Sequence, residues 1–138
     1  MSTNLTIVII VAIIMVGLIL YAATSTNRDN SKKDALLGKA EQLRKLADQP
    51  ITDSEMRDII VQFDSLLSKS LQLKLYNSDS CGDNLKKAKS LFNKSSYDAI
   101  WKAHKLRNDI VHDGATPNDR EFDQAVKSFV AVIYKLLG

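Results

Sequence analysis

The longest uninterrupted apolar run of the chain occupies residues 5–23, with the sequence LTIVIIVAIIMVGLILYAA and no charged side chain. At a rise of about 1.5 Å per residue, a helix of this length crosses the hydrocarbon core of a bilayer. The pattern therefore predicts a single transmembrane anchor within residues 1–24, with residues 5–23 in contact with the membrane.

A cleaved signal peptide is the alternative interpretation of this segment. The leading residues MSTN contain no Lys or Arg, and the apolar run is longer than the roughly 7–15 residues of a signal-peptide core. We therefore expect a retained anchor. Positive charge follows the run at Arg28, Lys32 and Lys33, so the C-terminal part should lie on the cytoplasmic side of the plasma or inner membrane.

Residues 25–33 are small and polar, which predicts a linker between the anchor and a domain at residues 34–138. Within that domain apolar residues recur at steps of three and four, the period of an amphipathic helix. The clearest stripe comprises Met56, Ile59, Ile60, Phe63, Leu66, Leu67 and Leu71. A second stripe near the C-terminus comprises Phe122, Val126, Phe129, Ile133 and Leu136.

Capping signals divide the domain into its helices. Thr52 with Glu55 forms a capping-box pattern, and Gly114 fits the left-handed position after a helix end. We also expect Ser95 or Ser96 to begin the helix over residues 97–112, and Thr116 with Pro117 to begin the last helix. No segment alternates with period two, so the expected fold is all-α, a transmembrane helix followed by a bundle of four or five helices.

The helix over residues 97–112 changes from apolar to polar along one side as it approaches its end in KLRNDIVHDG. His104, Asn108 and His112 follow one another on that side. Buried imidazole and amide groups need partners, so these side chains bond one another or meet a ligand. Arg107 lies about 140° around the helix from His112, so either its long side chain swings part of the distance or a second copy of the helix in a homodimer completes the arrangement.

This combination of side chains suits metal-independent cleavage of RNA. His112 can transfer a proton near neutral pH, Arg107 can stabilise phosphate charge, and Asn108 can orient either group. Between residues 86 and 107 there are seven basic residues and one acid, which would attract a polyanion. The binding residues expected from this run and its helix are His104, Lys86, Lys87, Lys89, Lys102 and Lys105.

No cofactor or metal is expected from the sequence. Two histidines eight residues apart lack the short ligand spacing of a zinc site, and Cys81, the single cysteine, lies in a segment that reads as a turn. No Cys-His relationship can be inferred from these positions. A single cysteine also agrees with a reducing compartment.

The segment RNDIVH resembles the R-polar-x-x-x-H signature of the HEPN superfamily, and its flanks YDAIWKAHKLRNDIVHDG, DNLKKAKSLF and FDSLLSKSLQL extend that resemblance over residues 52–137. The resemblance implies a four- or five-helix bundle that dimerises with two motifs facing each other. It also implies metal-independent endoribonuclease activity, with Arg107 stabilising phosphate, Asn108 at the polar position and His112 transferring protons.

Two other interpretations stay open at this point. The same fold can serve as a non-catalytic module that binds RNA, a nucleotide or a protein partner. Alternatively, Arg107 and His112 act only as favourable cations near a helix C-terminus, and the lysines form a solvated face.

Overall fold

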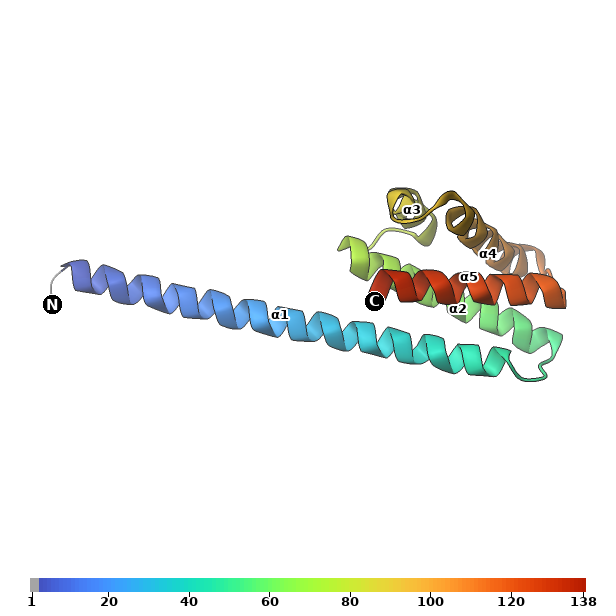
Figure 1. The fold of residues 1–138 in the computed structure, drawn as a ribbon, viewed down its shortest axis with the longest axis horizontal. Coiled ribbons are helices and arrows are strands. Elements are labelled where there is room, and N and C mark those ends of the chain that lie inside the picture. The colour runs from blue at the N-terminus through green and yellow to red at the C-terminus, as the bar shows by residue number, and fades with distance from the viewer. Residues whose placement is uncertain (1–2) are drawn as a thin grey trace. The chain divides into compact units, whose positions relative to one another are not determined.

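The computed structural model describes residues 3–138, and all regular structure in that range is helical, which confirms the all-α prediction (Figure 1). The chain divides into two compact units, residues 1–32 and 33–138, which we describe separately. The elements in chain order are α1 (Thr3–Ala47), α2 (Asp53–Leu75), α3 (Cys81–Lys87), the short 3₁₀ helix η1 (Lys89–Leu91), α4 (Lys94–Asp113) and α5 (Asp119–Leu137).

The first unit is the apolar part of α1. This helix is long and apolar enough to cross a membrane, as residues 5–23 predicted. Its aliphatic side chains are exposed in the unit itself, and Ile13 and Ile19 retain 66% and 63% of their accessible surface. Such a surface is compatible with contact with lipid.

Residues 25–33, predicted to form a polar linker, belong to α1 and are helical. The hydroxyl of Thr24 donates to the carbonyl of Leu20 at 3.0 Å, and that of Thr26 donates to the carbonyl of Ala22 at 2.9 Å. Polar side chains on a helix remain hydrated, and no Gly or Pro interrupts residues 18–37. A polar composition alone therefore does not interrupt the helix.

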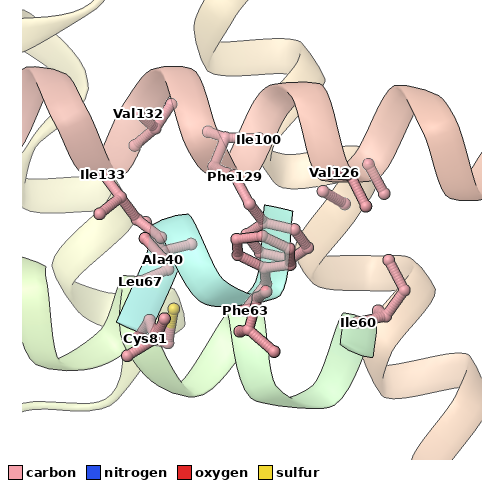
Figure 2. Packing of buried hydrophobic residues seen from close by; sticks show 14 of the residues in the cluster. Ala40, Ile60, Phe63, Leu67, Cys81, Ile100, Val126, Phe129, Val132 and Ile133 are labelled. Atoms are coloured by element: carbon pink, nitrogen blue, oxygen red, sulfur yellow. The ribbon is translucent and has the colours of Figure 1, made fainter. Parts of the chain in front are cut away.

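The second unit is a helical bundle around one apolar core. Helix α5 packs against α2 and α4, and α2 also contacts α3 and α4. Phe63 of α2 and Phe129 of α5 stack in the centre, with ring centroids 5.7 Å apart and nearly parallel planes (Figure 2). Both predicted stripes are buried in full, and the end of α1 adds Ala40 and Leu43 to the core.

Helix ends follow the expected capping chemistry at three positions. The Thr52 and Glu55 capping box is present, Tyr76 caps the C-terminal end of α2, and Gly114 caps that of α4 at φ 66°. Tyr76 also adopts the left-handed conformation, at φ 53°.

Two other helix starts differ from the prediction. Asn93, rather than Ser95 or Ser96, caps α4, because its side-chain oxygen accepts from the amide of Ser96 at 2.8 Å. Asn118, rather than Thr116, caps α5 in a capping box with Glu121. Asn is at least as good a capping residue as Ser or Thr, and in both helices it stands two or three residues from the predicted cap.

Candidate functional site

Three helices bring a carboxylate, a thiol and an imidazole together inside the bundle. Asp64 interrupts the apolar stripe of α2, Cys81 is the first residue of α3, and His104 lies in the middle of α4. One potential ligand atom from each, a carboxylate oxygen, Sγ and a ring nitrogen, lies within 4.8 Å of the other two. We call Asp64, Cys81 and His104 the buried polar cluster.

The best-defined contact of the cluster joins His104 to Asp64. Nδ1 of His104 lies 2.7 Å from Oδ1 of Asp64, and the two side chains are 12% and 5% exposed. An ionised carboxylate can only accept, so the ring carries its hydrogen on Nδ1. Trp101 meets the His104 ring edge to face at 5.8 Å, which restricts the ring further.

Arg107 reaches the same carboxylate from the next turn of α4. Its Nε lies 3.5 Å from Oδ2 of Asp64, and Nη1 donates to Oδ1 of Asn108 at 2.9 Å. Nε is buried and has no hydrogen-bond partner, because 3.5 Å to Asp64 is too long for a good bond. Arg107 and Asn108, two of the three residues predicted to be catalytic, are therefore joined by a hydrogen bond. Asp64 attracts the guanidinium of Arg107 electrostatically.

The third predicted catalytic residue, His112, lies apart from this arrangement. It sits in the last turn of α4 and is exposed. Within residues 3–138 no hydrogen bond or ion pair joins it to Arg107 or Asn108. One chain thus presents a partly buried guanidinium and an exposed imidazole at different positions on α4.

The basic residues before α4 are partly neutralised by acids that precede the run. Lys87 pairs with Asp79, and Lys86 lies 3.7 Å from Asp83. Lys89 lies over the ring of Tyr97 at 5.8 Å. The positive electrostatic potential of this segment is therefore weaker than the number of its lysines suggests.

Lys102 and Lys105 are exposed on α4 and border a groove of about 580 Å³ between α4 and α5. Small residues, Ala99, Ala103 and Ala125, form part of its floor.

Cys81 is not an activated nucleophile. Burial first, and then the negative charge of Asp64, raise the pKa of its thiol to about 12, although the positive charge of Arg107 opposes the shift. The thiol is therefore protonated at neutral pH, and a thiol of this kind is chemically inert.

The buried polar cluster was largely missed by sequence reasoning. His104 was expected only as an additional contact, and Cys81 was placed in a turn, whereas it begins α3 and lies beside His104. One usable signal was Asp64 itself, an acid within the apolar sequence IIVQFDSLL. An acid at a core position of a helix needs a partner from another element.

Comparison of the chain with family models, curated proteins and solved structures finds no match.

Proposed function

We propose that the protein is a membrane-tethered, HEPN-like endoribonuclease that acts as a homodimer without a catalytic metal. Residues 5–23 would serve as a retained single-pass anchor. Arg28, Lys32 and Lys33 favour a cytoplasmic position for the helical domain at the plasma or inner membrane.

The observation that carries the proposal is the arrangement of two basic side chains on α4, those of Arg107 and His112. Arg107 is oriented by Asp64 and Asn108 before any substrate arrives, while His112 remains accessible at the end of the same helix. A pre-oriented guanidinium can stabilise charge on a phosphate without further ordering. An exposed imidazole can reach a hydroxyl that arrives from solvent.

The proposed reaction is an intramolecular transesterification. His112 accepts the proton of a ribose 2′-hydroxyl, whose oxygen forms a bond to the adjacent phosphorus. The bond from phosphorus to the 5′-oxygen then breaks, and that oxygen takes a proton from water, while His112 returns its own proton to solvent. Arg107 stabilises the additional negative charge on the phosphoryl oxygens, and the products carry a cyclic phosphate and a 5′-hydroxyl.

A dimer is part of the proposal because one helix does not unite the two groups. Arg107 and His112 lie about 140° apart around α4, so a single chain presents them in different directions. Two copies related by a two-fold axis would bring Arg107 of one chain towards His112 of the other. Lys102 and Lys105 would then flank the shared cleft.

Full-length protein in detergent should cleave single-stranded RNA with EDTA present. His112→Ala and Arg107→Ala should each lower the rate by about 100-fold or more, with circular dichroism unchanged. Asp113→Ala, which alters an exposed neighbour, is the matched control and should cleave normally. Equal cleavage by His112→Ala and the parent protein would refute the catalytic assignment.

A non-catalytic module is the second candidate, and one observation favours it. Asp64 offsets the charge of Arg107, and in one chain His112 is not oriented by the motif. Such a module would bind RNA, a nucleotide or a protein partner. Its signature would be salt-dependent RNA affinity with no cleavage at any pH.

A further inference from the structure

The buried polar cluster has the composition of a metal site, although the sequence spacing gave no indication of one. We propose that Asp64, Cys81 and His104 together bind one Zn²⁺ ion, with a fourth position left for water. The proposal concerns the interior of the bundle and does not depend on the ribonuclease proposal. The bound ion would stabilise the bundle by joining three of its helices.

The positions of the three ligand atoms come close to those of a loaded site. They lie within 4.8 Å of one another, and each comes from a different helix. Tetrahedral zinc with bonds of 2.0–2.3 Å would hold such atoms about 3.3–3.7 Å apart. Nδ1 of His104 and Oδ1 of Asp64 lie closer than this, at 2.7 Å, so the ion would replace the proton between them while side-chain rotations of about 1 Å adjust the three spacings.

The donor types select the class of ion. A thiolate, an imidazole and a carboxylate form a mixed S, N and O set that suits zinc, whereas Mg²⁺ and Ca²⁺ prefer oxygen ligands alone. The side chains of Asp64 and His104 are 5% and 12% exposed, and Cys81 as a residue is 9% exposed, so water competes little for the site.

A divalent cation suits the chemistry of the cluster, because it can displace the thiol proton of Cys81 and bind the thiolate next to the carboxylate of Asp64. Arg107 stays compatible with the ion, since it approaches Oδ2 of Asp64 while Oδ1 faces His104.

A bound ion would affect the fold chiefly through α3. This helix has seven residues, too few to be stable by itself. Cys81 begins it, so a bound ion would connect α3 directly to α2 and α4. Zinc would thereby fix the segment from which the lysines before α4 extend.

The test is a titration of full-length, reduced, metal-free protein in detergent with Co²⁺, a spectroscopic substitute for zinc. One equivalent should produce a thiolate-to-cobalt charge-transfer absorption, and one equivalent of Zn²⁺ should abolish it. The chain has a single cysteine, so this band reports on Cys81 without any substitution. Absence of the band in folded wild-type protein would overturn the proposal.

Variants then assign the other ligands. Cys81→Ser should lose the band, His104→Gln should weaken binding by more than about 100-fold, and His112→Gln, which removes the other histidine, should bind normally. Zinc should also raise the melting temperature of the wild type and of His112→Gln, but not that of His104→Gln. Binding that survives both Cys81→Ser and His104→Gln would place the ion elsewhere and refute the site.

The two proposals fail in distinguishable ways. Loss of RNA cleavage in His112→Ala with normal cobalt spectra would support the ribonuclease assignment and leave the metal site intact. A wild-type protein that cleaves RNA but gives no cobalt band would retain the ribonuclease proposal and eliminate the metal site.

Discussion

Oδ1 of Asp64 lies 2.7 Å from Nδ1 of His104, although forty residues separate the two in the chain. The pair joins α2 to α4 across the edge of an otherwise apolar core. Because Arg107 approaches the second oxygen of the same carboxylate, Asp64 has two basic partners. The register of α4 against α2 is therefore defined by polar contacts as well as by packing.

Replacing Asp64 by Ala should destabilise the domain by about 3 kcal/mol, because it leaves His104 and Arg107 without their carboxylate. The free energy of unfolding can be followed in urea with EDTA present through Trp101, the single tryptophan, which lies against His104. Asp58→Ala, at an exposed position of α2, is the control and should change stability by less than about 0.5 kcal/mol. Equal stability of the two variants would show that the carboxylate is dispensable.

Mixing two inactive variants should restore cleavage if the active site is shared between chains. Arg107→Ala and His112→Ala would form heterodimers in which one of two sites has both native residues. Random exchange predicts recovery of about a quarter of wild-type activity. The measurement is the rate of RNA cleavage after the two proteins are exchanged in detergent. No recovery, despite confirmed exchange of chains, would contradict a site built from both copies.

Neutralising Lys102 and Lys105 should weaken RNA binding more than neutralising Lys86 and Lys87, whose charges are already offset by Asp83 and Asp79. For each exposed lysine that contacts a phosphate, the slope of log affinity against log salt should fall by about 1. Fluorescence anisotropy with labelled RNA at several salt concentrations measures both quantities. Identical slopes for the two double variants would show that local pairing does not determine the binding surface.

The contacts of Glu41 with Arg44 of its own helix and with Tyr134 of α5 should make stability depend on acid pH. Arg44 chiefly, with the hydroxyl of Tyr134, lowers the pKa of Glu41 to about 2 from its ordinary 4.5. A pKa that is depressed by folding contributes stability above about pH 4.5, and this contribution disappears as the pH falls towards 2.

Glu41→Gln should therefore lower the melting temperature slightly at pH 7 and much less at pH 2.5. Thermal unfolding of both proteins at the two pH values tests this. Asp34→Asn removes an exposed carboxylate of the same helix and controls for net charge. A difference between wild type and Glu41→Gln that stays constant with pH would exclude the linkage.

Local patterns were sufficient to predict most of the bundle. The stripes from Met56 to Leu71 and from Phe122 to Leu136 lie in the core because helical periodicity and burial have one cause, the removal of apolar surface from water. The Thr52 capping box depends only on residues three apart and was also predicted correctly. The helical state of residues 25–33 was not predicted, because a polar composition is compatible with both a helix and a linker.

The candidate site was harder to predict because its contacts are not local. Nothing in the sequence around His104 indicates that Asp64 and Cys81 will meet it, since this depends on how α2, α3 and α4 pack. Arg107 and Asn108 are neighbours, and their contact follows from adjacency. The relation of Arg107 to His112 is still a prediction that depends on a second chain.

The position of Cys81 also makes its thiol a probe of local opening of the helical bundle. A thiol that is 9% exposed reacts with alkylating reagents only when the surrounding helices part, so its labelling rate in metal-free protein measures how often that end of the bundle opens. Since the chain has no other thiol, mass spectrometry of the intact protein would give the labelled fraction over time, and hence the opening rate, in detergent and in native membranes alike.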